Sequence, residues 1–402
     1  MARNGRKGGC LGCLSLLALF VTVLVVAIVF LAPVSLRNVL ASYRYRLLTK
    51  LGVEQTYGQR AEQSDVGYAG STLSDRELEV YLQLLAGVEQ MSKSFEVYGA
   101  SGADIDPAYK ALMRDHPELF WLDGSCSYTY TPIGQVVTVT PGVTMSAEEV
   151  PVVRAAIDEV VEAFFATLPE GAGEYDIAQA AYEYVINTTD YNTEAPNNQN
   201  IQSVFLSHES VCAGYSRAYQ YLLQRAGIFC AYVDGDIVET SEDHAWNLVQ
   251  LEGQYAYVDC TWGDPTYTGA VEQIPQEGII YDYFCLTTDE LTRDGHLLAD
   301  PDIWPHCDAK DLDYYRRSGL FFESYDNAAL SEAFWRMVYE NRQVLSFKFG
   351  TDEACAQAAS ALENGEFLYD DLMQIASQQG ENGLLYGYTV SDSLRIIKLY
   401  WQ

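Results

Sequence analysis

The most informative shortage in this chain of 402 residues is that of basic side chains after residue 50. Residues 1–50 carry seven Lys or Arg and no Asp or Glu, which leaves 17 basic against 56 acidic residues in the remainder. A body this acidic repels phosphate backbones, so nucleic acid is excluded as a partner. The acidity indicates either a soluble, exposed protein or a cleft that attracts basic substrates.

Cysteine is too sparse and too widely spaced for a small disulfide scaffold. Seven of the nine cysteines follow residue 50, and this odd number leaves a thiol unpaired unless it pairs with another chain. Cys10 and Cys13 lack the second pair that a structural zinc site needs. His296, His306 and Cys307 lie in a Pro- and Asp-rich segment without ligand spacing. We therefore assign them structural or surface roles and expect no metal and no cofactor.

Charge is also absent from a long apolar run at residues 14–32. Its 19 residues can cross the ~30 Å hydrocarbon core as a helix, and the run exceeds the about 7–15 residues of a cleaved signal peptide. Three basic residues precede it, four follow it, and an acidic body comes after them. We predict a single-pass anchor in the cell membrane, with the N-terminus inside and the catalytic body extracellular.

Composition and periodicity divide the chain into five parts. They are a cytoplasmic tip with the anchor (1–33), a stalk or linker (34–73), an N-terminal α/β extension (74–148), a central domain (149–325) and a small C-terminal α+β domain (326–402). Apolar residues at helical spacing predict a strong helix over 145–168 in the central domain. His116 precedes a proline, and we interpret it as a structural loop histidine.

The first candidate for a reactive side chain is Cys212. Apolar residues at helical spacing follow it as far as Ala226, and Gly227 stands where a C′ glycine belongs. With Ser210 as the N-cap, Cys212 falls in the first turn, where exposed amides and the helix dipole stabilise a thiolate. Position alone leaves a buried structural cysteine as an equal alternative.

A predicted hairpin supplies a histidine and an aspartate. We expect a strand at 228–233, a polar loop at 234–243, and then two strands that turn at Glu252-Gly253. A two-residue turn places His244 opposite Thr261, with Asp259 as the diagonal neighbour, and a register shifted by one pair places His244 directly opposite Asp259. Both registers face these two side chains the same way.

A carboxylate beside an imidazole fixes the tautomer and stabilises the imidazolium, which can activate a cysteine. A lone strand histidine is more often structural. A cysteine at a helix start, a histidine at a strand start and an aspartate on the paired strand favour a Cys212, His244 and Asp259 triad instead.

Four motifs make a resemblance specific. They are Val-Cys-Ala-Gly-Tyr-Ser at 211–216, Leu-Leu-Gln-Arg-Ala-Gly-Ile at 222–228, His-Ala-Trp-Asn-Leu-Val at 244–249 and Tyr-Val-Asp-Cys-Thr-Trp-Gly-Asp-Pro at 257–265. Over about residues 150–290 the chain closely resembles the bacterial transglutaminase-like superfamily. His-Pro-Glu-Leu-Phe-Trp from 116 and Tyr-Asp-Tyr-Phe from 281 resemble extensions of its surface members.

The resemblance implies an α+β fold with a papain-like core, in which a catalytic helix packs on an antiparallel sheet. It implies that Cys212 is the nucleophile, that His244 is the general base and acid, and that Asp259 orients His244. In this chain the core is flanked by the predicted transmembrane helix and the small C-terminal α+β unit.

Further positions match the family less directly. Trp246, Trp262 and Asp264 stand at recurrent positions that shape the site, and we assign the two tryptophans to substrate contacts. The backbone amide of Cys212 is the natural oxyanion donor. Gln199, in the polar loop that precedes the cysteine, is the second candidate for contact with the substrate or the oxyanion.

The leading hypothesis is an extracytoplasmic thiol enzyme that acts on carboxamide or peptide bonds through a cysteine thioester. An amine resolves the thioester in an acyltransferase, and water resolves it in a protease or amidase. The expected substrate is a protein or peptide at the cell surface or cell wall. We identify no calcium loop, so the calcium dependence of some animal relatives is not transferred. The alternatives are a non-catalytic surface interaction module and a disulfide-linked structural protein, which needs Cys212 oxidised.

Overall fold

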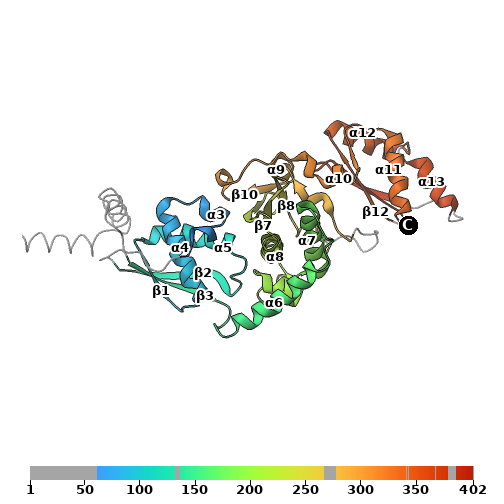
Figure 1. Cartoon of the computed structure of the whole chain (residues 1–402). Coiled ribbons are helices and arrows are strands. Elements are labelled where there is room, and N and C mark those ends of the chain that lie inside the picture. The colour runs from blue at the N-terminus through green and yellow to red at the C-terminus, as the bar shows by residue number, and fades with distance from the viewer. Residues whose placement is uncertain are drawn as a thin grey trace, which may run out of the picture. The chain divides into compact units, whose positions relative to one another are not determined.

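The computed structural model describes residues 61–131, 136–266, 278–340, 342, 344–366, 368–378 and 386–401. The predicted anchor and residues 34–60 of the predicted stalk lie outside these ranges. Within them, no helix combines the length and the apolar character needed to cross a bilayer. The chain divides into two compact units, Met1–Thr144 and Met145–Gln402 (Figure 1).

The first unit combines helices with an antiparallel sheet in the order β1-β3-β2. Its elements are α3 (Tyr68–Ser71), α4 (Asp75–Glu89), β1 (Phe95–Tyr98), α5 (Gly102–Asp115), β2 (Leu122–Thr131) and β3 (Val136–Val143). The backbone amides of Ala69 and Gly70 each donate to the Asp115 carboxylate at 2.8 Å. The predicted C-terminal boundary of the stalk, residue 73, is therefore wrong, because α3 is part of the folded first unit.

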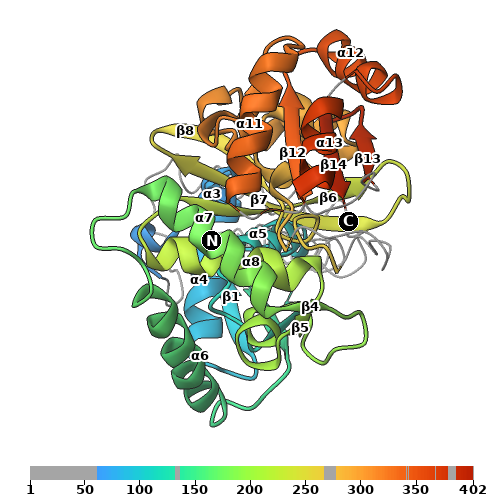
Figure 2. The same ribbon diagram turned by 90° about the vertical axis from the view of Figure 1, so that its right-hand side faces the viewer.

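The second unit contains the predicted helix on an antiparallel sheet. The sheet has the order β10-β6-β7-β8-β9, and helix α8 packs on β6 and β7 on one side and on α7 on the other (Figures 1 and 2). The elements are α6 (Val150–Phe165), α7 (Glu174–Thr188), β4 (Asp190–Tyr191), β5 (Glu209–Ser210), α8 (Cys212–Arg225), β6 (Cys230–Ile237), β7 (Asp243–Leu251), β8 (Gln254–Val258), β9 (Phe284–Leu286) and β10 (His296–Leu298). The α+β core is thus confirmed.

Close packing fixes the start of α8. A Cβ on Gly214 would lie 1.9 Å from Ser210 Oγ and 2.7 Å from the Asn198 carbonyl oxygen, so only glycine fits there. The predicted N-cap is wrong, because Val211 occupies it and the Ser210 hydroxyl instead contacts Ser203 Oγ at 2.7 Å. At the other end Gly227 has a φ of 76°, which confirms the predicted C′ glycine.

The hairpin register is the one that a two-residue turn requires. Leu251 pairs with Gln254 and Asn247 with Val258, and positive φ angles at Glu252 and Gly253 match a type I′ turn. The polar loop predicted over 234–243 is wrong, because β6 runs on to Ile237 and β7 begins at Asp243. Pairing with β10 on its other side extends β6, and local polarity does not reveal this long-range contact.

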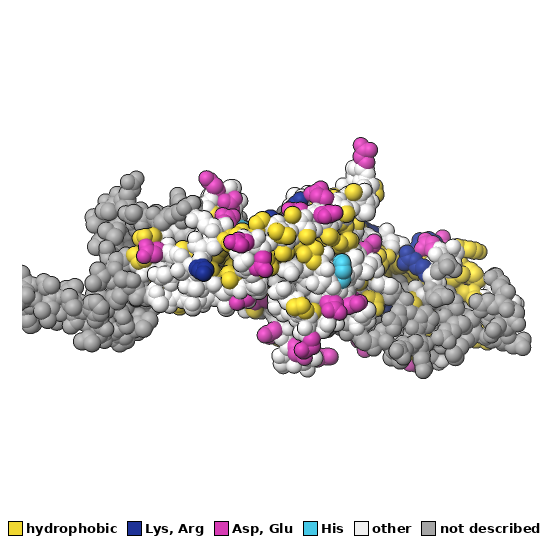
Figure 3. Space-filling model, turned by 90° about the horizontal axis from the view of Figure 1, so that it is seen from below, with side chains coloured by type: hydrophobic (Ala, Val, Ile, Leu, Met, Phe, Trp, Pro, Cys, Tyr) yellow, Lys and Arg dark blue, Asp and Glu magenta, His cyan; other side chains and the backbone are white. Residues whose placement is uncertain are grey.

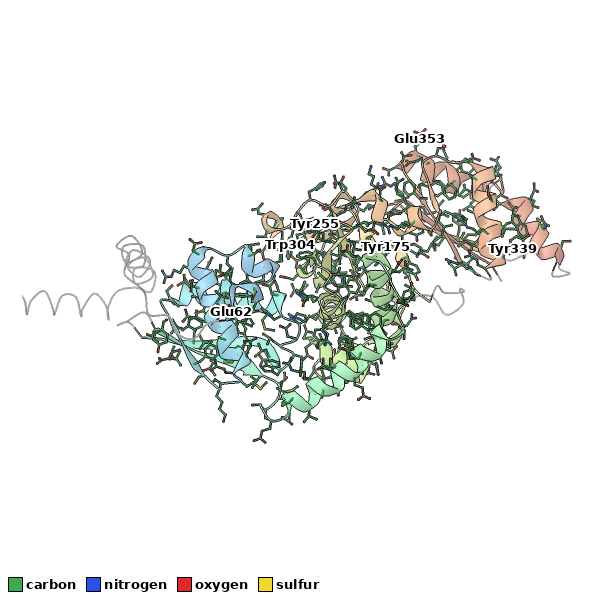
Figure 4. The ribbon with its side chains drawn as sticks, viewed as in Figure 1. Glu62, Tyr175, Tyr255, Trp304, Tyr339 and Glu353 are labelled. Carbon is green, nitrogen blue, oxygen red and sulfur yellow. The ribbon has the colours of Figure 1, made fainter. Side chains whose placement is uncertain are left out.

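The C-terminal residues form a second sheet in this unit, in the order β11-β12-β14-β13. Its elements and the connecting helices are α9 (Thr288–Arg293), α10 (Tyr314–Arg317), β11 (Phe321–Phe322), α11 (Asn327–Tyr339), β12 (Val344–Phe349), α12 (Asp352–Glu363), α13 (Tyr369–Gln378), β13 (Tyr386–Ser391) and β14 (Ile396–Trp401). Buried Lys348 of β12 lies 2.7 Å from Glu290 and 2.5 Å from Asp313. The Arg317 guanidinium lies 3.9 Å from the ring of Tyr175, which Figure 4 labels on α7.

Candidate active site

Helix α8, strand β7 and the segment after β8 bring three predicted residues together. Cys212 is the first residue of α8, His244 is the second of β7, and Asp259 directly follows β8. His244 Nε2 lies 2.7 Å from Asp259 Oδ2, and Cys212 lies near enough to the same imidazole to help raise its pKa. Because Nε2 is engaged by the carboxylate, Nδ1 is the ring nitrogen left for the sulfur.

The charges in this site support one another. Burial by itself lowers the pKa of His244, but the Asp259 charge and hydrogen bond, together with Cys212, outweigh it and raise the pKa to about 10. Burial would raise the pKa of Asp259, yet His244 and His296 hold it well below its usual value. At neutral pH the imidazole is therefore an imidazolium beside the sulfur. A cation beside the sulfur and the positive end of a helix are the surroundings in which reactive cysteines are generally found.

Asp259 accepts four hydrogen bonds, although its side chain is almost fully buried. Oδ1 accepts from the backbone amides of Thr261 at 2.9 Å and Trp262 at 3.1 Å. Oδ2 accepts from His244 and from His296 Nε2, which lies 3.2 Å away. Four donors keep a buried carboxylate charged and in one orientation.

His296 is the residue that the sequence prediction missed. The sequence assigned it a structural or surface role, and the surface alternative is wrong, because the side chain is buried against Asp259. Strand β10 pairs with β6 so that His296 lies opposite Ile237. No local sequence pattern around His296 predicts this pairing. His306, which the sequence analysis considered together with His296, is exposed.

His244, Asp259 and His296 each offer one ligand atom within 4.8 Å of the others. Hydrogen bonds account for the short distances between these atoms without a metal, since both imidazoles donate to the carboxylate. A mononuclear zinc site also needs a fourth position, and these three side chains are buried. The trio is therefore best described as an imidazole–carboxylate–imidazole array.

The predicted contact residues fall in two places. Gln199 is exposed and lines the cleft at Cys212. Trp246 and Trp262 pack near the histidines instead, with Trp246 5.8 Å from the His244 ring and Trp262 4.8 Å from the His296 ring. Neither tryptophan is among the described residues that line this cleft, and their assignment to substrate contacts stays a prediction.

Asp264 supports α8 from the neighbouring segment. Its Oδ2 lies 2.7 Å from the Tyr215 hydroxyl, which also lies 2.8 Å from the Thr189 carbonyl oxygen. Both side chains are buried. Asp264 thus links the segment after Asp259 to the helix that carries Cys212.

A cleft of about 640 Å³ opens at the cysteine. Cys212 and His244 lie in its wall. Among the described residues, no Lys or Arg lines the cleft, whereas three aspartates do: Asp234, Asp236 and Asp243. Asp236 and Asp243 are directly paired across β6 and β7. Acidic side chains also recur over the face of the molecule in Figure 3. The cleft therefore favours positively charged groups.

The described cysteines form no disulfide. All seven are free thiols, and only Cys126 and Cys212 are not buried. Cys212 is thus reduced and reaches the cleft, which is the state a nucleophile needs.

Comparison with known proteins agrees with this geometry. Residues 166–260 match the family model described as the transglutaminase-like superfamily. The kyphoscoliosis peptidase of Mus musculus is 26% identical over 126 residues, which cover 28% of this chain and 19% of that protein. The kyphoscoliosis peptidase of Homo sapiens is 24% identical over 160 residues, which cover 36% and 23%. The chain thus spans about a fifth of the length of these curated relatives.

Among solved structures, one titled as that of a TGase is 17% identical. It covers 38% of this chain and 46% of its own, with a TM-score of 0.26. The segment matched by the family model contains Cys212, His244 and Asp259, whereas His296 lies beyond it. The chain therefore contains a domain of the transglutaminase-like superfamily.

Proposed function

We propose that this protein is a thiol acyltransferase or peptidase that acts on carboxamide or peptide bonds through a thioester on Cys212. One observation carries the proposal: a reduced cysteine at the start of α8 shares the cleft wall with His244 and acts on its pKa, and His244 is itself bonded to buried Asp259. The curated relatives named as peptidases support the same class of chemistry.

The first half-reaction forms the thioester. The Cys212 thiolate attacks the carbonyl carbon of the substrate, and the new C–S bond pushes the carbonyl π electrons onto oxygen. When the oxyanion collapses, the C–N bond breaks and the His244 imidazolium gives its proton to the leaving amine. His244 is then neutral, and Asp259 keeps its ring in the orientation that accepts the next proton.

The second half-reaction resolves the thioester. His244 removes a proton from an amine or a water molecule as that nucleophile attacks the thioester carbonyl. Collapse of this intermediate breaks the C–S bond and restores the thiolate and the imidazolium. An amine yields a new amide, whereas water yields a carboxylic acid.

The oxyanion forms next to the first turn of α8. Amides in the first turn of a helix have no intrahelical acceptor, so the Cys212 amide is available to stabilise this charge. Gln199, exposed at the cleft, supplies the second donor in this proposal, from the loop that precedes α8.

The acidic wall of the cleft supports a cationic acyl acceptor. Asp236 and Asp243 face each other at the cleft, and their like charges are relieved by a positively charged group. A lysine side chain or a diamine offers such a charge. We therefore favour transfer to an amine, with hydrolysis as the competing outcome.

We also propose that the protein is a single-pass membrane protein whose N-terminus is inside and whose catalytic body is extracellular. The uncharged run at residues 14–32 supports this placement. A protein or peptide at the cell surface or cell wall is then the substrate. Labelling of Cys126 in intact cells by a membrane-impermeant maleimide tests the placement, and protection from this reagent until the cells are lysed contradicts it.

Product masses from a glutamine-containing peptide test the function. We expect the wild-type protein to add pentane-1,5-diamine to the peptide faster than pentylamine, because the diamine brings a second cation to the cleft. Without an amine, water gives the deamidated or cleaved peptide. C212A should form none of these products, whereas the matched control C126S should form all of them.

Turnover by C212A equal to that of the wild type would show that Cys212 is not the nucleophile. Equal rates with pentane-1,5-diamine and pentylamine would remove the proposed preference for a cation and leave the thioester chemistry in place.

A further inference from the structure

We infer that His296 is a positioning residue of this site, which holds the Asp259 carboxylate in register with His244. The inference rests on the proposed function and extends it by a fourth residue. His296 lies outside both the motifs and the family match, and only the pairing of β10 with β6 brings it to the site.

The contact is specific and buried. His296 Nε2 lies 3.2 Å from Asp259 Oδ2, the same oxygen that His244 Nε2 approaches at 2.7 Å. The rings of the two histidines are 5.7 Å apart. Since both side chains and the carboxylate are almost fully buried, water does not compete for these hydrogen bonds.

The other ring nitrogen of His296 shows that packing alone does not explain the residue. Nδ1 is buried and has no hydrogen-bond partner among the described residues. Leaving a buried polar atom unsatisfied costs about 1–3 kcal/mol, and an apolar side chain would avoid that cost. The hydrogen bond from Nε2 to Asp259 is the favourable interaction that offsets this cost.

This bond complements the two backbone amides on Oδ1. Those amides fix one oxygen of Asp259, and His296 contacts the other oxygen beside His244. Without His296, Oδ2 is held by His244 alone, and the pair can move together. The imidazolium then loses its fixed place beside the Cys212 sulfur.

The C-terminal sheet holds the turn that carries His296. The Ser393 hydroxyl donates to Asp294 Oδ1 at 2.5 Å, two residues before His296. Arg293 forms a 2.6 Å ion pair with Asp352 and donates to the Asp392 carbonyl oxygen at 2.6 Å. The C-terminal sheet therefore anchors the start of β10, which gives this part of the chain a role in the site.

The test compares H296L, H296Q and the control H306A in the full-length protein. Leucine removes the donor, whereas the glutamine amide nitrogen reaches to about the position of Nε2 and keeps it. The readout is the rate of Cys212 alkylation by iodoacetamide as a function of pH, which needs no knowledge of the natural substrate. Turnover of the glutamine peptide and the thermal unfolding temperature are measured alongside.

In the wild type we expect fast alkylation to persist to acidic pH, because the imidazolium stabilises the thiolate. H296L should lose about tenfold or more of the rate near pH 6, since loss of fixed geometry at a catalytic group costs that order of magnitude. H296Q should recover most of it, and H306A should match the wild type.

An H296L protein that folds and keeps the wild-type pH profile overturns the role of His296 alone. The same holds if H296Q is no better than H296L. A wild-type Cys212 that titrates as an ordinary thiol overturns the proposed function as well, so the two failures are distinguishable.

If H296L does not fold, nuclear magnetic resonance of wild-type protein with ¹⁵N-labelled histidine decides. The inference requires a proton on Nε2 of His296. A proton found only on Nδ1 contradicts it.

Discussion

Each of the two compact units contains a buried aspartate close to a histidine: Asp115 in the first unit and Asp259 in the second. The two clusters differ in the group to which the histidine is bonded. In the first unit, Asp115 accepts from the Ala69 and Gly70 amides and from the Tyr81 hydroxyl at 3.0 Å. His116 contacts that hydroxyl at 2.7 Å, so the tyrosine hydroxyl is bonded to both the imidazole and the carboxylate. The second ring nitrogen of His116 is bonded to Glu118.

In the second unit, His244 and His296 both form hydrogen bonds to Asp259 directly. His244 also lies in the wall of the cleft that contains the reduced Cys212. Burial raises the pKa of Asp115, whereas the histidines hold that of Asp259 low despite its burial. A buried aspartate near a histidine is therefore not in itself a catalytic site. The direct bond and the adjoining nucleophile make the difference.

The largest effect should come from replacing each aspartate by asparagine. D259N should lower turnover by about 10³–10⁴-fold, because asparagine neither stabilises the imidazolium nor enforces the reactive tautomer. D115N should leave turnover little changed and lower stability by about 1–3 kcal/mol, since it disturbs buried hydrogen bonds. Peptide turnover and chemical denaturation measure the two effects. Equal losses of turnover in D259N and D115N would contradict the claim that only the Asp259 cluster is catalytic.

A smaller effect should appear in the pH dependence of stability. The pKa of Asp259 is lowered on folding, so its stabilising contribution is present above the ordinary value of 3.8 and is lost as the pH falls. The pKa of Asp115 is raised on folding, so its contribution is greatest below 3.8 and is lost as the pH rises through the folded value.

Denaturation from about pH 6 to about pH 3 tests the sign for Asp115. The free energy of unfolding of the wild type relative to D115N should grow as the pH falls. A difference that stays constant or shrinks would contradict the raised pKa of Asp115. D259N gives no matched comparison, because removal of Asp259 also removes the main cause that raises the pKa of His244.

Local patterns predicted much of the central site. The helical spacing after Cys212 located α8, and the Glu252-Gly253 turn fixed the hairpin register that aligns His244 with the strand leading to Asp259. Both features depend on residues close in sequence, where backbone geometry allows few alternatives.

Long-range contacts explain what the sequence did not reveal. Ser210 is not the N-cap because its hydroxyl serves Ser203 and the Asn198 carbonyl. His296 reaches Asp259 only because β10 pairs with β6, and the same pairing extends β6 into the predicted loop. The stalk prediction failed at its end because α3 is held by Asp115, which follows it by more than forty residues. None of these contacts has a local signature.

The most direct test of the central claim is the intact mass of the protein after a brief reaction with an activated acyl ester and an acid quench. We expect the wild type to gain the mass of the acyl group on Cys212, as mapped by digestion, and to lose it when an amine is added. C212A should gain no such mass, and C126S should behave like the wild type. An acyl group on any residue other than Cys212, or turnover without an acyl adduct, would contradict the account.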